Sequence, residues 1–124
     1  MAEALIGIDV NTQYIAAQSD PQEGKFAFAY TITITNHDKQ AWRLINRMWQ
    51  ITDGSGQVEE VRGEGVVGKQ PKLQPGESFR YTSGALLQTP LGSMQGHYEF
   101  HADDGEVCQA PIPLFSLTAP HLVH

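Results

Sequence analysis

The sequence predicts an all-β fold, a two-sheet β-sandwich of about seven to eight strands in a single domain over residues 1–124. Bulky and small residues alternate with period two in several stretches, which is typical of strands with one buried face. Clusters of Gly, Pro, Asn and Asp separate these stretches at the short spacing expected of a sandwich. The length of 124 residues fits one domain with one hydrophobic core.

The first two strands are expected at residues 4–10, extended toward Ile15, and at residues 25–35. The second is the clearest in the chain, because Phe, Tyr and Ile on one face alternate with Ala and Thr on the other. Residues 20–24, Asp-Pro-Gln-Glu-Gly, form the turn between them.

Residues 41–52 fit either a strand or a helix. A strand is preferred, because Asp-Gly-Ser-Gly at 53–56 leads directly into an extended pattern at 57–62, as in a hairpin. The apolar phase of 41–52 is imperfect: Trp49 shares its phase with Arg47, and Leu44 lies in the other phase. This mismatch predicts a β-bulge or a strand covered on both faces.

Three further strands are expected in the C-terminal half, at 78–83, 94–100 and 106–117, with turns between them. Pro111 and Pro113 lie inside the last of these, and because proline cannot donate to a ladder, they place this strand at a sheet edge.

Composition and charge exclude several classes of protein. The net charge is −6 and there is no run of basic residues, so a duplex nucleic-acid partner is not expected. Neither an apolar stretch of about 20 residues nor a signal peptide is visible, which predicts no membrane partner and a cytoplasmic location. Cys108 is the only cysteine, so no internal disulfide can form, and it is expected to be a buried or half-buried residue.

Residues 63–68, Gly-Glu-Gly-Val-Val-Gly, match the G-x-G-x-x-G pattern of dinucleotide-binding proteins. That pattern indicates dinucleotide binding only when it lies between a strand and a helix. Here Pro71 and Pro75 follow too soon for a helix to form. One interpretation is structural: the glycines allow tight turns and bulges.

The other interpretation is an anion site for a nucleotide or pyrophosphate at Gly63, Gly65, Gly68 and Lys69. Consecutive backbone amides can form a nest for phosphate without a helix. Arg62 and Lys72 would add positive charge at either end.

A second candidate site is the series His97, Glu99, His101 and Asp103. Residues two apart in a strand share a face, and imidazole and carboxylate groups are ligands for cobalt, nickel or zinc. The alternative is a solvated polar face, and no metal ligand set is assigned. His121 and His124 are expected to lie in an exposed chain end.

Trp42 lies near a turn and outside the best phase of its strand, so it is a candidate exposed interface anchor, with partial burial under a loop as the alternative. Gly96-His97-Tyr98 resembles the G-x-Y step of immunoglobulin and fibronectin type III domains, where the tyrosine hydroxyl bonds to nearby backbone. No nucleophile elbow, HExxH or Walker motif is present, which predicts no catalytic residues, and no cofactor is implied.

Several separate motifs resemble the bacterial ApaG family and together cover nearly the whole chain. In order they are WQITD at 49–53, EVRGEGVVGKQP at 60–71, LQPGE at 73–77, YTSG at 81–84, TPLGSMQGHY at 89–98 and PIPLFSL at 111–117. The resemblance implies a fibronectin type III-like β-sandwich over a single ApaG domain.

The same resemblance implies an association with cobalt tolerance and magnesium efflux, and a gene that neighbours a diadenosine tetraphosphate hydrolase. Similar domains in eukaryotes are joined to F-box proteins and to a DNA polymerase delta-interacting protein, where they resemble interaction modules. The leading expectation is therefore a non-enzymatic domain that binds an unknown protein partner or forms a homodimer. The alternatives are a binding module for phosphate-bearing small molecules at residues 63–68 and a divalent-metal binder.

Overall fold

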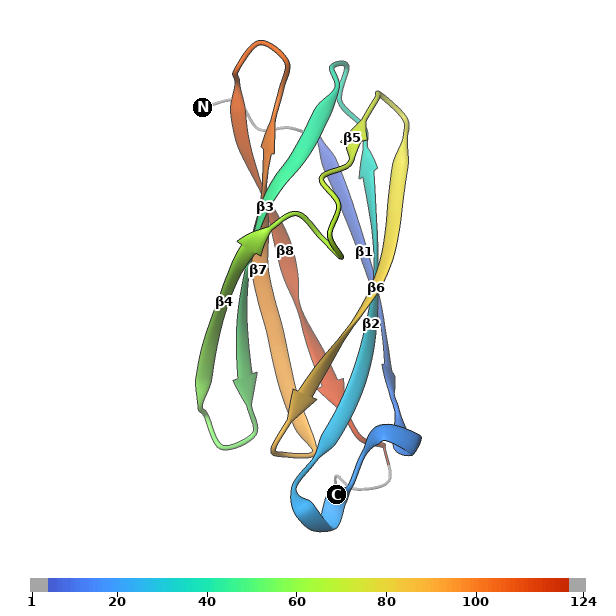
Figure 1. Ribbon diagram of the computed structural model, residues 1–124, viewed down its shortest axis with the longest axis vertical. Helices are drawn as coiled ribbons and strands as arrows, with labels where there is room; N and C mark the ends of the chain where they lie inside the picture. Colours follow the sequence, from blue (N-terminus) through green and yellow to red (C-terminus); the bar gives the residue numbers. More distant parts are fainter. Residues whose placement is uncertain (1–4, 121–124) are drawn as a thin grey trace.

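The computed structural model describes residues 5–120, which form two antiparallel sheets packed face to face (Figure 1). The strands are β1 Ile6–Tyr14, β2 Phe26–Asn36, β3 Trp42–Asp53, β4 Val58–Glu64, β5 Lys72–Leu73, β6 Ser78–Leu87, β7 Leu91–His101 and β8 Val107–Thr118. Two short 3-10 helices, η1 Ala16–Gln18 and η2 Pro21–Glu23, lie between β1 and β2. The predicted all-β sandwich is confirmed.

One sheet has three strands in the order β1-β2-β6, and the other has five, in the order β4-β3-β7-β8 with β5 paired to β3. Strands β1 and β6 are therefore the edges of the first sheet, and β4 and β8 lie at the edges of the second. The edge position predicted from Pro111 and Pro113 in β8 is confirmed.

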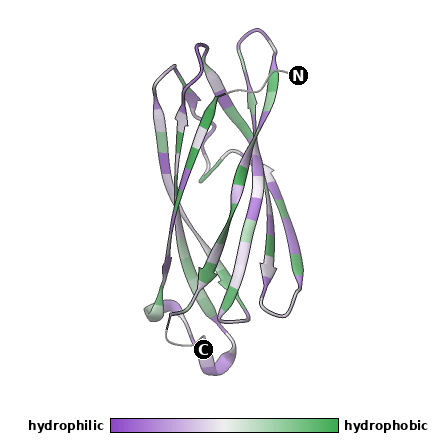
Figure 2. Ribbon diagram, turned by 180° about the vertical axis from the view of Figure 1, so that it is seen from behind, coloured by the Kyte–Doolittle hydropathy of each residue, from purple (hydrophilic) through white to green (hydrophobic). Residues whose placement is uncertain are grey.

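The core lies between the sheets. Hydrophobic and hydrophilic residues alternate along the strands, as Figure 2 shows. In β2 the five predicted inward residues, from Phe26 to Ile34, are all buried. Trp49 of β3 packs edge-on against Tyr30, Tyr98 and Phe115 at ring-centroid distances of 5.4, 6.3 and 5.8 Å. These contacts join both sheets and add to the area removed from water.

A bulge in β3 resolves the imperfect phase seen in the sequence. The register between β3 and β7 shifts between Leu44 and Asn46, which inverts the alternation at that point. Leu44 before the shift and Trp49 after it can therefore both face the core, with 0% and 3% exposure. The strand interpretation of residues 41–52 is confirmed.

Asn36 is the one buried polar residue in the described part of the chain. Its amide nitrogen donates to the carbonyl oxygens of Gln40 and Leu73, both at 2.9 Å, and its side-chain oxygen accepts from the Asp38 amide at 2.8 Å. Asn36 thus joins the end of β2 to β5 in the other sheet. Every hydrogen-bonding group it buries is satisfied, as burial of a polar side chain requires.

Candidate functional site

The glycine segment, residues 63–69, ends β4 and reverses the chain. The Gly65 amide donates to the Ile45 carbonyl at 2.7 Å, and Val66 and Lys69 exchange two backbone hydrogen bonds of 2.8 and 2.9 Å. The two residues between them, Val67 and Gly68, have φ values of 44° and 78°. Positive φ at both central positions is typical of a type I′ turn.

No α-helix occurs in residues 5–120, so none leaves the glycine segment, and the interpretation against a dinucleotide motif agrees with the fold. The amides of Gly65, Val66 and Lys69 already donate to backbone carbonyls, which removes three donors from a phosphate nest. Gly65 has a clear structural role, because a Cβ added there would lie 2.3 Å from the Lys69 carbonyl oxygen. Phosphate binding by the backbone of Gly63–Gly68 and by exposed Lys69 stays a prediction.

The two flanking cations both have carboxylate partners. Arg62 Nε lies 2.7 Å from Glu60 Oε1, and Lys72 Nζ lies 2.7 Å from Asp103 Oδ2. Their charge is therefore shared with these carboxylates.

Arg47 is the cation that the structure brings to the glycine segment. Its Nη1 donates to the carbonyl oxygens of Glu64 and Gly65 at 2.9 and 2.8 Å. The guanidinium lies directly over Gly63, where an added Cβ would be 2.7 Å from Nη2. The sequence carries one signal for this residue, since Arg47 shares the inward phase of Trp49, but that phase alone does not assign it to a site.

Tyr81 of β6 and Tyr98 of β7 join the two sheets through a hydrogen bond between their hydroxyl groups. This differs from the expected bond between the Tyr98 hydroxyl and nearby backbone. The reason is the position of Tyr98, fully buried between the sheets, where the hydroxyl meets the opposite sheet first. Burial raises the pKa of both phenols well above the ordinary value, while the Arg47 charge acts in the opposite direction.

The histidine series forms one His–Glu contact. His101 Nε2 lies 2.8 Å from Glu99 Oε2, which also accepts a hydrogen bond from Asn46 at 3.2 Å. Asp103 lies beyond the end of β7 and pairs with Lys72. Within residues 5–120 no group of three or more His, Cys, Asp or Glu is placed to hold a metal ion, and His121 and His124 fall outside the described residues.

The hypothesis that Trp42 is an exposed anchor is wrong, and the alternative, burial of its side chain, is closer to the structure. Its side chain is 1% exposed, and the indole N–H donates to Asp38 Oδ2 at 3.0 Å. The bulge between Leu44 and Asn46 explains the error, because it turns Trp42 to the same side as the inward residues that follow it. Cys108 is buried, as predicted.

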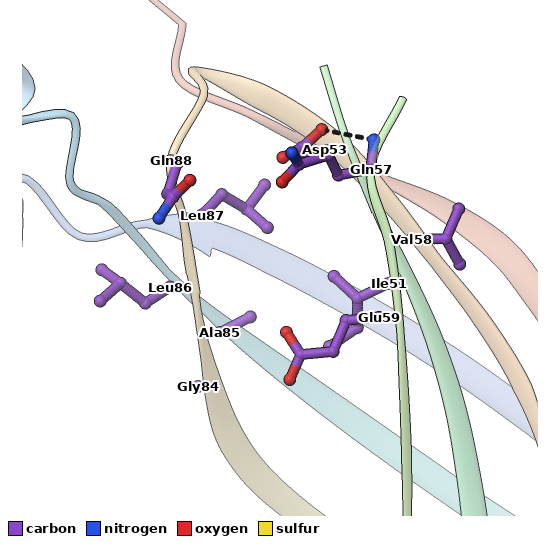
Figure 3. Close-up of a pocket in the computed structure, with 10 residues that line it drawn as sticks. All are labelled: Ile51, Asp53, Gln57, Val58, Glu59, Gly84, Ala85, Leu86, Leu87 and Gln88. Carbon is purple, nitrogen blue, oxygen red and sulfur yellow. Dashed lines mark hydrogen bonds between the residues drawn. The ribbon is translucent and has the colours of Figure 1, made fainter. Parts of the chain in front are cut away.

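A groove of about 390 Å³ lies between β6 and the β3–β4 hairpin (Figure 3). Ala85 and Leu87 line its β6 side and Ile51 lines its β3 side. The Glu59 carboxylate of β4 points across the groove toward Ala85, whereas Leu86 points away from it (Figure 3).

The edge of β6 beside this groove has no partner strand among the described residues. The Asn36 amide, at the end of β2, donates to the Glu77 carbonyl at 2.9 Å, so Asn36 and Glu77 form a hydrogen-bonded pair of the β2–β6 ladder. Because such pairs alternate along an antiparallel ladder, the backbone groups of Arg80, Thr82, Gly84 and Leu86 point to the open edge. An edge of this kind is a template for another strand.

No helix in residues 5–120 is long and apolar enough to cross a membrane.

The family model described as ApaG domain matches residues 16–102. The chain is 54% identical over 119 residues to Protein ApaG of Xanthomonas oryzae pv. oryzae (strain PXO99A), covering 96% of this chain and 94% of that one. Protein ApaG of Azoarcus sp. (strain BH72) is 51% identical with the same coverage.

A solved structure gives the same result at the level of the fold. The crystal structure of a protein assigned as ApaA from Bordetella pertussis superposes with a TM-score of 0.92 at 45% identity. The superposition covers 95% of this chain and 96% of that one. The chain therefore belongs to the ApaG domain family.

Proposed function

We propose that this chain is a non-enzymatic interaction domain that binds an extended segment of a partner protein along the open edge of β6. The observation that carries the proposal is the ten-residue β6, paired on one side only, beside a groove between the two sheets. A peptide that adds as a new strand gains main-chain hydrogen bonds from the edge and side-chain contacts from the groove.

The groove favours a segment that carries a basic residue. Its charged lining residues are Asp53 and Glu59, and no Lys or Arg lines it. Asp53 accepts hydrogen bonds from Ser55 and Gln57 within its own turn. Glu59 has no hydrogen bond or ion pair to any described residue, so its carboxylate is available to a Lys or Arg of the partner.

The ApaG relatives carry names that state no enzymatic activity, which is compatible with a binding role. In this proposal the family's association with cobalt tolerance and magnesium efflux runs through a bound protein rather than through an ion held by this domain.

The test uses random twelve-residue peptides displayed on phage and selected against the whole chain. We expect recovered peptides to alternate apolar residues with Lys or Arg. Gly84→Pro should weaken their binding by roughly tenfold or more, since it removes an outward amide and adds a ring to the edge, while every hydrogen bond to β2 remains.

Gly84→Ala is the matched control, because it keeps the amide and its added Cβ would make only an ordinary contact, 3.4 Å from the Phe28 carbonyl oxygen. Equal binding to the Gly84→Pro and Gly84→Ala variants would overturn the proposal. Sedimentation of the chain without peptide tests whether a second copy of the chain occupies the β6 edge. A dimer that Gly84→Pro, but not Gly84→Ala, converts to monomer would show a second copy of this chain on the edge instead.

A further inference from the structure

A second cavity, of about 260 Å³, lies between the sheets next to the glycine segment. Arg47 and Trp49 of β3, Tyr30 of β2, Tyr81 of β6 and the turn at Val67 line it. The groove beside Gly84 shares none of these residues, so the two spaces are separate features of the same side of the sandwich.

Arg47 brings an uncompensated positive charge to this cavity. The ion pairs in residues 5–120 are Arg62–Glu60, Lys72–Asp103 and His101–Glu99, and Arg47 is in none of them. Its Nη1 group uses both hydrogens on backbone carbonyls, which leaves three of the five guanidinium N–H donors without a partner among the described residues. Half-buried and held in place over Gly63, the guanidinium is already oriented for a ligand.

The tyrosines add further donors. Tyr30 is 6% exposed and its hydroxyl makes no hydrogen bond to any residue between 5 and 120. No buried side-chain oxygen of these residues lacks a partner, so this hydroxyl is the part of Tyr30 that reaches solvent. Tyr81 and Tyr98 share one hydrogen bond between two O–H groups, so one of these hydroxyls still has a proton to donate. Tyr81 lines the cavity and Tyr98 does not, so the spare proton serves the cavity when Tyr98 donates the shared bond and Tyr81 accepts it.

Acceptors are few on the same walls. Glu64 is the one carboxylate among the lining residues, and its position opposite Asn46 in the ladder puts its side chain on the outer face of the sheet, away from Arg47. A small cavity with a guanidinium, several unpaired donors and no inward carboxylate is complementary to an anion.

We propose that this cavity binds a small oxyanion of the phosphate type, held by the Arg47 guanidinium and the hydroxyls of Tyr30 and Tyr81. Its volume suits inorganic phosphate or a single phosphate group on a larger molecule, rather than a whole nucleotide. The site differs from a backbone nest at residues 63–69, because side chains of three strands supply the donors. It does not depend on the interaction function proposed for β6.

The test is titration of the whole chain with inorganic phosphate at constant ionic strength, followed by thermal unfolding and by NMR of the arginine side chains. We expect a concentration-dependent rise in Tm, because a ligand of the folded state stabilises it by mass action. Arg47→Gln should weaken phosphate binding by roughly tenfold or more. Arg62→Gln is the matched control, since it removes the same charge from the outer face of β4 and should leave binding unchanged.

Tyr30→Phe provides a second variant that keeps the packed ring and removes only the hydroxyl. It should weaken phosphate binding by roughly threefold to tenfold with no change in fold. Absence of a phosphate-dependent shift in the unsubstituted chain would overturn the proposal. Equal weakening by Arg62→Gln or by Lys69→Ala would overturn it too, because binding would then follow surface charge or the turn rather than the cavity.

Discussion

At the scale of residues, the hydroxyl pair of Tyr81 and Tyr98 is a polar contact that joins the two sheets in their common core. Both phenols are buried, and burial raises their pKa because a phenolate would lose its hydration there. A group with a raised pKa in the folded state contributes stability that is complete below its unfolded pKa, about 10, and is lost as the pH rises above that value.

The free energy of unfolding should therefore fall above about pH 10, by about 1.4 kcal/mol per pH unit for each of the two phenols. Urea unfolding followed from pH 8 to pH 11 checks this slope. The double variant Tyr81→Phe/Tyr98→Phe should show a shallower fall. Tyrosinate absorbance from all four tyrosines while the chain was still folded would contradict the raised pKa of the two buried phenols.

Asn36 offers a second test at this scale, since its side chain satisfies the carbonyls of Gln40 and Leu73. Asn36→Ala should lower the free energy of unfolding by about 2–3 kcal/mol, because these acceptors would stay buried without a donor. Asn11→Ala, on an exposed position of β1, should change it by less than about 0.5 kcal/mol. Similar effects of the two substitutions in chemical denaturation would argue against a structural role for Asn36.

At the scale of elements, the sequence predicted what depends on local periodicity and missed what depends on a neighbouring strand. Alternation in residues 25–35 located β2 and its inward face correctly. The phase of Trp42 was misjudged, because a bulge against β7 inverts the alternation and leaves no local signal of its position. The two-residue β5 is too short for any periodic pattern, and β6 continues to Leu87 through a Gly-Ala step that has low strand propensity.

The candidate sites depend on neighbouring strands in the same way. The glycine pattern marked a turn correctly, but the hydrogen bonds that occupy its amides come from chain reversal and from Ile45, 20 residues away in β3. Arg47 could not be assigned to a cavity, since Tyr30 and Tyr81 meet it only when the two sheets pack together.

The backbone of Val67 is strained in the turn at Val67 and Gly68, and this strain can be tested. Val67 is β-branched and has φ of 44°, a conformation that costs such a residue about 1–2 kcal/mol. Val67→Asn should raise the free energy of unfolding by about 0.5–1 kcal/mol, because Asn-Gly is the preferred pair in a type I′ turn. The urea midpoint measures this gain, and Val67→Thr, which keeps the branch, should show none.

Substitution of the neighbouring Gly65 should have the opposite effect on the free energy of unfolding. Gly65→Ala should lower the free energy of unfolding by at least about 2 kcal/mol, since its Cβ would meet the Lys69 carbonyl oxygen. Normal stability of this variant would show that the segment can open without cost, and would weaken the structural interpretation of its glycines.

At the scale of the whole molecule, the two sheets close over one core but leave β4 and β6 as edge strands that line the same groove. The inward Glu59 on β4 hinders the addition of another strand at that edge. Strand β6 has no comparable inward charge. Its residues that face the core are Phe79, Tyr81, Ser83, Ala85 and Leu87. Of these two edges, β6 is therefore the one better suited to accept a strand.

The most direct test of this claim is backbone amide hydrogen exchange along β6, measured with and without a selected peptide. If the peptide pairs with β6, the outward amides, those of Thr82, Gly84 and Leu86, gain protection on binding. The amides of Tyr81, Ser83 and Ala85, which face β2, should change little because they are bonded already. Protection that appears on β8 or on an outer sheet face, with the outward β6 amides unchanged, would contradict this pairing.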